Sequence, residues 1–243
     1  MSTLTEHLIE QYHSQGYVIL TDALHDDQLS ALREEADLLV NHLLSEGYDL
    51  VDDLGCIVEP LTCGYLDKPD SEQYRIDVKL YKERRDSILL GHQLSDLTLT
   101  FVARLAKELL KDDVYLLNEQ YIIKPPHTAS KSQFAWHRDS DYLSPTLQKQ
   151  HTVACWIALD PVTLENGTLL VESLKNGETT VVEVAAGSIV FMSNRVRHKS
   201  TGNKSALFRR AFMPQYSTQP MQDSATEYIG IALPCLATKQ KNN

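Results

Sequence analysis

The chain has 243 residues, of which 42% are hydrophobic and 23% charged, a length and composition that predict one globular domain over residues 1–243. Its formal net charge of −10 argues against a nucleic-acid partner, because affinity for a phosphate backbone depends on lysine and arginine. No apolar run is long enough to span a membrane and the polar N-terminus lacks a signal-peptide pattern, so we expect a cytoplasmic protein without a membrane partner.

The first part of the chain, residues 1–113, is predicted to be a mostly helical flank with a variable lid. Thr3 and Glu6 fit a capping box, which predicts a first helix that ends at Gly16. The apolar residues 17–20 follow directly and are typical of a short strand.

Two further helices are expected before the short strands begin. Asp26 or Asp27 is expected to cap a helix whose apolar stripe ends at Gly47. Residues 48–90 show no sustained period, and we expect them to form either an irregular wrap or a lid over the site. Ser95 is expected to cap the third helix.

From residue 114 on, short apolar runs separated by turn residues predict β-strands. Asn166-Gly167 and Asn176-Gly177 are pairs that favour tight hairpins. Helices first and strands afterwards predict a mainly β fold with flanking α-helices, in which helices cover an antiparallel barrel or sandwich formed by residues 114–216. The expected strands of this core are residues 114–123, 152–158, 168–172, 179–184, 188–192 and 206–213.

A candidate metal-binding motif lies in the middle of the chain. His137 and Asp139 are two residues apart, so in an extended segment their side chains project from the same face. Such a pair alone is common and is often only structural. His198 follows an apolar run, residues 187–192, that reads as a buried strand and can supply a second histidine. Two histidines and one carboxylate form the facial triad that suits non-heme Fe(II) oxygenases.

Two consecutive arginines lie within the last expected strand. Because neighbouring side chains in a strand face opposite sides, one of Arg209 and Arg210 is expected to point inward. A guanidinium is costly to bury unless it meets a carboxylate, and its planar fork suits bidentate binding of that group.

Several stretches of the chain together resemble a known family, namely residues 16–20, 124–126, 136–139, 165–168, 187–191, 198–205 and 209–210. On these stretches the sequence resembles the phytanoyl-CoA dioxygenase family of Fe(II)- and 2-oxoglutarate-dependent oxygenases. The resemblance implies a double-stranded β-helix, which is a cupin-like jelly-roll barrel. It also implies Fe(II), the cosubstrate 2-oxoglutarate and O2 as the cofactors.

The resemblance further implies roles for individual residues. The implied iron ligands are His137, Asp139 and His198, and the implied partner of the distal carboxylate of 2-oxoglutarate is Arg209. The positions that resemble the lining of the cosubstrate or substrate pocket are Asn118, Gln120 and Lys124. Substrate contacts are expected beside the ligands, at Trp136, Asp141 and Tyr142. The alternative for Trp136 is that it is an ordinary core residue, and the alternative for Asp141 and Tyr142 is that they lie in a solvated loop.

We therefore expect an enzyme that hydroxylates a C–H bond of a small-molecule substrate and releases succinate and CO2. Asp139 favours this reaction, because related halogenases replace the carboxylate ligand with a small residue. Residues 171–177 depart from the Pro-Gly-Ser-His stretch of the family, in a region that bears on substrate access. The alternatives are a non-catalytic cupin-like binding or regulatory module and a zinc hydrolase, although the latter leaves Arg209 without a role.

Overall fold

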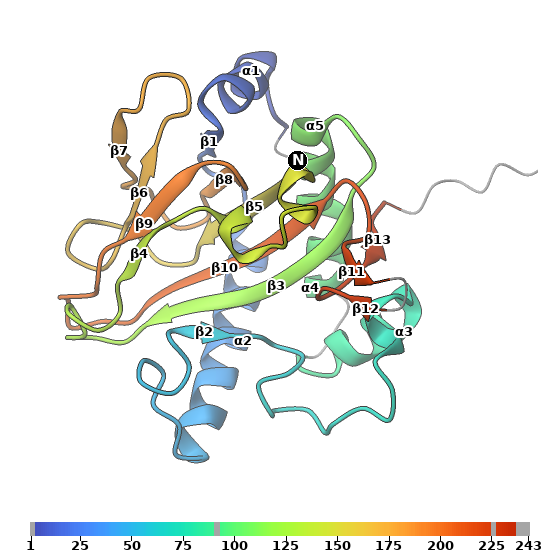
Figure 1. The fold of residues 1–243 in the computed structure, drawn as a ribbon. Helices are drawn as coiled ribbons and strands as arrows, with labels where there is room; N and C mark the ends of the chain where they lie inside the picture. The colour runs from blue at the N-terminus through green and yellow to red at the C-terminus, as the bar shows by residue number, and fades with distance from the viewer. Residues whose placement is uncertain (1–2, 90–92, 225–226, 237–243) are drawn as a thin grey trace, which may run out of the picture.

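The computed structural model describes residues 3–89, 93–224 and 227–236, which form two main antiparallel sheets and a separate two-stranded antiparallel sheet, flanked by helices (Figure 1). The helices are α1 (Glu6–Gln15), α2 (Asp26–Ser45), α3 (Val78–Asp86), α4 (Gln93–Asp96), the π-helix η2 (Leu97–Val102), α5 (Ala103–Leu110), and the short 3-10 helices η1 (Gln73–Arg75), η3 (Asp139–Tyr142) and η4 (Leu147–Lys149). The strands are β1 (Tyr17–Leu20), β2 (Ile57–Val58), β3 (Tyr115–Lys124), β4 (Phe134–His137), β5 (Thr152–Ala158), β6 (Leu169–Glu172), β7 (Thr179–Val181), β8 (Ile189–Ser193), β9 (Arg197–Ser200), β10 (Arg209–Ser217), β11 (Gln222–Ser224), β12 (Glu227–Tyr228) and β13 (Leu233–Pro234).

The larger sheet has the strand order β1-β8-β5-β10-β3-β13, with β2 paired to β3, and the smaller sheet has the order β4-β9-β6-β7. Every strand pair in both sheets is antiparallel. The predicted mainly β fold with flanking helices is confirmed, and it is the double-stranded β-helix that the family resemblance implied. Among the helices of the described ranges, none combines the length and the apolar character needed to cross a membrane.

The two faces of the larger sheet pack against different layers, as the two-residue period of a strand requires. Cys155 and Ile157 of β5 pack with the apolar faces of α2 and α5, in one continuous core cluster. Ala154 and Trp156 point the other way and pack with Val171 of the smaller sheet in a second cluster. The larger sheet therefore separates these helices from the space between the two sheets. Figure 1 shows α2 and α5 on the far side of the larger sheet.

The predicted helix starts were wrong by a few residues, for reasons visible at the caps. The N-cap of α1 is Thr5 rather than Thr3, since its hydroxyl accepts a hydrogen bond from the backbone N–H of Leu8 at 3.3 Å. The N-cap of α2 is His25, whose N–H donates to the Gln28 side chain at 3.0 Å. Asp26 and Asp27 instead occupy the first turn of α2, where the helix dipole favours acidic residues.

Other predicted boundaries also moved. Ser95 does not cap a helix but lies inside α4, which continues through the π-helix η2 into α5. The strand expected at residues 206–213 begins later, at Arg209, because the Asn203 side chain holds the preceding loop. Its Oδ1 accepts from the backbone of Ser205 at 2.9 Å, and its Nδ2 donates to the carbonyls of Lys124 and Leu207 at 3.0 and 2.7 Å.

Residues 48–89 contain short elements rather than one regular structure. β2 adds to the edge of β3, with Ile57 and Val58 opposite Ile122 and Tyr121. The segment then forms η1 and α3, and α3 is fixed to the rest of the molecule by the fully buried Arg85. This part of the chain is therefore a wrap with short helices that packs on the larger sheet.

Candidate metal centre and cosubstrate pocket

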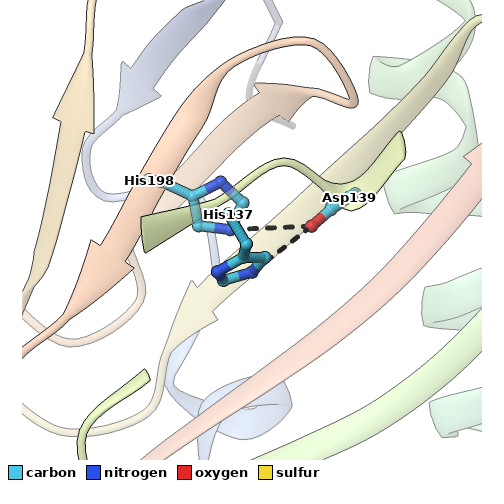
Figure 2. A group of neighbouring side chains, drawn as sticks. All are labelled: His137, Asp139 and His198. Atoms are coloured by element: carbon cyan, nitrogen blue, oxygen red, sulfur yellow. Dashed lines mark ion pairs between the residues drawn. The ribbon is translucent and has the colours of Figure 1, made fainter. Parts of the chain in front are cut away.

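Three side chains that the sequence singled out converge on one point of the smaller sheet (Figure 2). His137 ends β4 and lies directly opposite His198 of β9 in the strand register. Asp139 follows at the start of η3, and its Oδ1 lies 3.8 Å from Nε2 of His137 and 3.6 Å from Nε2 of His198. All three candidate ligand atoms lie within 4.8 Å of one another, which is compatible with a single shared metal ion.

Both histidines are oriented by the backbone so that the same ring nitrogen faces the site. Nδ1 of His137 lies 2.8 Å from the carbonyl of Ala135, and Nδ1 of His198 lies 3.2 Å from the carbonyl of Val196. A carbonyl only accepts hydrogen bonds, so Nδ1 carries the proton and Nε2 keeps its lone pair for a metal. Burial also lowers the pKa of His198, which favours the neutral imidazole that metal binding requires. The donor set therefore fits a divalent metal ion.

A cavity of about 480 Å³ opens beside the three ligands and lies between the two sheets. The smaller sheet contributes the two histidines, and the larger sheet contributes strands β3, β5, β8 and β10. Its apolar wall includes Trp156, Leu169 and Met192. The residues that the segment 48–89 adds to the lining are Ile57, Glu59, Leu61, Thr62, Tyr74 and Arg75.

Arg209 lines this cavity and is completely buried. Its Nη1 donates to the carbonyl of Ile122 at 3.4 Å, and its guanidinium lies 5.4 Å from the centre of the Trp156 ring. In the described part of the chain its Nε has no hydrogen-bond partner and no carboxylate forms an ion pair with it. Burial lowers the pKa of Arg209 to about 10, so the guanidinium stays charged at neutral pH. A buried cation in this state favours an anionic ligand.

Lys124 lies directly opposite Arg209 on the paired strand β3 and is also fully buried. Its Nζ donates to Oγ of Ser200 at 2.6 Å and to the carbonyl of Thr201. Burial, with a smaller contribution from Arg209, lowers the pKa of Lys124 to about 6. Among the described residues, Ser200 lines the cavity and Lys124 does not. Lys124, which was expected in the pocket, therefore lies behind the cavity wall.

The other expected site residues divide into two groups. Asn118 and Gln120 line the cavity, and the Asn118 amide donates to the Gln120 side chain at 3.2 Å. Tyr142 also lines it, with its ring 5.6 Å from that of His137. Neither Trp136 nor Asp141 lies in the described lining.

The contacts of these last two residues explain their positions. The Trp136 ring lies beneath the side chains of Arg197 and Lys199, at 4.9 and 5.1 Å, on the face of β4 opposite His137. Asp141 accepts a hydrogen bond from the backbone N–H of Arg138 at 2.8 Å and thereby closes the turn that begins η3.

One residue of the site was missed by the sequence analysis. Gln215 lines the cavity and donates from Nε2 to Oδ2 of Asp139 at 3.1 Å. It lies six positions after Arg209 on β10, so the two-residue period places both side chains on the same face. That spacing was a usable signal once Arg209 had been assigned to the inward face.

Solved structures with the same fold were found in a comparison of the coordinates. The α-ketoglutarate-dependent carbocyclase SnoK from nogalamycin biosynthesis matches with a TM-score of 0.64 and 18% identity, over 90% of this chain and 85% of that chain. EvdO2 from Micromonospora carbonacea var. aurantiaca, complexed with 2-oxoglutarate, matches with a TM-score of 0.62 and 17% identity, over 93% and 96%. EctD from S. alaskensis, with 2-oxoglutarate and 5-hydroxyectoine, matches with a TM-score of 0.60 and 17% identity, over 88% and 76%.

At these identities the structural likeness concerns the fold. A sequence comparison with curated proteins gave no match. The family model described as phytanoyl-CoA dioxygenase matches residues 12–172, which is more than half of the chain and includes His137 and Asp139. The match thus covers the helical flank, the wrap and the first strands of the core. The chain belongs to the phytanoyl-CoA dioxygenase family.

Proposed function

We propose that the protein is a non-heme Fe(II)- and 2-oxoglutarate-dependent dioxygenase that hydroxylates a C–H bond of a small molecule. One observation carries this proposal: a two-histidine, one-carboxylate cluster shares a cavity with a buried guanidinium whose Nε has no partner in the described residues. The cluster matches the facial triad of non-heme iron oxygenases, which keeps coordination positions open. The guanidinium supplies a carboxylate anchor in the same cavity.

Each of these side chains has a distinct task in the proposed reaction. His137, Asp139 and His198 hold Fe(II), and Arg209 binds the distal carboxylate of 2-oxoglutarate. The bound iron, with 2-oxoglutarate and O2, supplies the oxidising power and yields succinate and CO2. The apolar wall around Trp156 limits water near the reacting groups, which protects the oxidant from side reactions.

The neighbouring structures support the cosubstrate but differ in reaction. EvdO2 and EctD were solved with 2-oxoglutarate, whereas SnoK is a carbocyclase and SnoN is an epimerase. We propose hydroxylation because Asp139 would hold the metal at the position that a halide takes in related halogenases. We also propose that the wrap, through Thr62, Tyr74 and Arg75 on the cavity wall, selects the substrate.

An anaerobic spectral titration tests this proposal. Fe(II) and 2-oxoglutarate added together to the protein should give a weak visible charge-transfer band, which neither gives alone. The Asp139→Ala variant serves as the control that lacks the carboxylate ligand. The proposal fails if properly reconstituted protein shows no band and forms no succinate on exposure to air.

A further inference from the structure

We infer that Gln215 is a positioning residue that holds Asp139 as a one-oxygen ligand of the metal. The inference rests on the proposed metal centre. The two carboxylate oxygens of Asp139 have different surroundings. Oδ2 accepts the hydrogen bond from Nε2 of Gln215 at 3.1 Å, whereas Oδ1 faces His137 and His198 at 3.8 and 3.6 Å. The amide thus occupies one oxygen and leaves the other for the metal.

Asp139 needs such support because no strand holds it. The two histidines lie on the paired strands β4 and β9, whose register fixes their separation. Asp139 lies beyond the end of β4, in the four-residue helix η3, and its side chain is 17% exposed. A hydrogen bond from a different sheet therefore restrains a carboxylate that its own segment leaves free to rotate.

The surroundings of Gln215 suit this role. In the strand register its neighbours are Asn118 on β3 and Ala154 on β5, and the small alanine leaves room for the longer side chain. The pairing of β10 with β3 shifts directly after Gln215, where the register skips Leu117. Bulges of this kind occur next to active sites and re-aim nearby side chains. Among the described residues, Asp139 is the only side chain that hydrogen-bonds to the Gln215 side chain.

The chemistry of an amide explains why glutamine fits this position. Nε2 donates to Oδ2 but adds no charge, so Asp139 keeps its full negative charge for the metal. With Oδ2 engaged, the carboxylate does not chelate through both oxygens. One coordination position would thereby be left for the other reactants, and Gln215 acts on the metal through Asp139.

The test measures metal affinity in place of turnover. Ni(II) serves as the probe because imidazole and carboxylate bind it well and it does not start oxidation. Calorimetric titration of Gln215→Leu should give an affinity about 10- to 100-fold weaker than that of the original protein, which is the usual effect of removing such a partner. The matched control is Gln148→Leu, since the Gln148 amide also donates one hydrogen bond, to the carbonyl of Leu143 at 3.0 Å, and contacts no ligand.

A double-mutant cycle separates positioning from general structural support. In the Asp139→Ala background, the Gln215→Leu change should produce no further loss of Ni(II) affinity, because the group through which it acts is absent. Equal losses in both backgrounds, or wild-type affinity of the single variant, would overturn the inference. If Gln215→Leu does not fold, Gln215→Met replaces it, with near-equal length and no donor. If the unchanged protein does not bind Ni(II), the metal centre itself is refuted, which is a different result.

Discussion

Two buried basic side chains, Arg209 and Lys124, lie opposite each other on the paired strands β10 and β3. Lys124 is satisfied by Ser200 and Thr201, and its lowered pKa of about 6 allows it to be neutral. Arg209 remains charged and has an Nε without a partner in the described part of the chain. This difference supports the proposed role of Arg209 as the anchor for an anion and a structural role for Lys124 behind the cavity wall.

We predict that Arg209→Ala weakens 2-oxoglutarate binding while metal affinity stays nearly unchanged. The loss should be about 2–5 kcal/mol, as for truncation of one partner in a buried charge pair. Arg210→Ala is the matched control, because Arg210 faces the opposite side and pairs with Asp160 at 2.7 Å and Asp37 at 2.6 Å. Calorimetry with Ni(II)-loaded protein checks both variants. Loss of metal binding with intact 2-oxoglutarate binding would show that Arg209 has another role.

The lowered pKa of the buried Lys124 predicts that the stability of the fold depends on pH. Its folded-state pKa of about 6 lies below the unfolded value of 10.5, so between these values the unfolded chain binds more protons. The free energy of unfolding should therefore rise with pH in that window, by up to about 1.4 kcal/mol per pH unit from this group. Urea denaturation of the wild type and of Lys124→Met, compared between about pH 6 and about pH 9, measures the difference. A constant difference across that range would mean that Lys124 stays protonated in the folded protein.

At the scale of elements, the buried guanidinium of Arg85 connects α3 to α2 and β3. Arg85 donates from Nη2 to Glu35 at 2.6 Å and from Nε to Glu119 at 3.2 Å. The hydroxyl of Tyr81 donates to Glu119 at 3.0 Å, and the hydroxyl of Tyr121 donates to Glu35 at 2.6 Å. This network holds the wrap, and with it one wall of the cavity, against the larger sheet.

Replacing this arginine should be strongly destabilising. Arg85→Met leaves two carboxylates buried without their counter-charge, so the free energy of unfolding should fall by about 3–5 kcal/mol. Lys79→Met on the same helix is the control, because among the residues that the structure describes Lys79 forms an ion pair only with Glu83, at 3.7 Å. The two side chains are 82% and 58% exposed. Equal stability of the two variants in urea denaturation would contradict the assigned role of the network.

How well each element was predicted depended on how local its determinants are. The strand at residues 152–158 was predicted with its observed bounds, because all seven of its residues are buried between two layers and read as one apolar run. β9 escaped prediction because its sequence, Arg-His-Lys-Ser, is polar. Its inward residues are His198 and Ser200, which face the cavity rather than an apolar core. The strand expected at residues 206–213 begins three residues later, because residues 206–208 belong to a loop that the Asn203 side chain holds.

The site itself was predictable to the extent that its residues carry distinctive chemistry. His137, Asp139 and His198 were singled out by residue type and spacing, and the family resemblance selected Arg209 over Arg210. The structure brings all four to one cavity, namely the three candidate ligands and Arg209. Gln215 has no such signal alone, since its role depends on which strand faces η3.

At the scale of the whole molecule, the fold consists of a helical layer, a larger sheet and a smaller sheet, with the cavity between the sheets. The helices α2 and α5 pack on the outer face of the larger sheet, away from the candidate metal ligands. The candidate metal ligands come from the smaller sheet and the adjoining η3, and the proposed anion anchor comes from the larger sheet. Binding of metal and cosubstrate would therefore connect the two sheets. The organisation of the chain as a single domain stays a prediction.

The formation of succinate from 2-oxoglutarate in air tests the central claim most directly. Protein loaded with Fe(II) should convert 2-oxoglutarate to succinate slowly even without its substrate when ascorbate is present as the two-electron reductant, and His198→Ala should lose this activity because one candidate metal ligand is missing. Quantifying succinate by mass spectrometry gives the result for both proteins. Succinate from the wild type, with none from His198→Ala, would support a catalytic iron centre. Binding of Fe(II) and 2-oxoglutarate without any succinate, or equal succinate from His198→Ala, would contradict it.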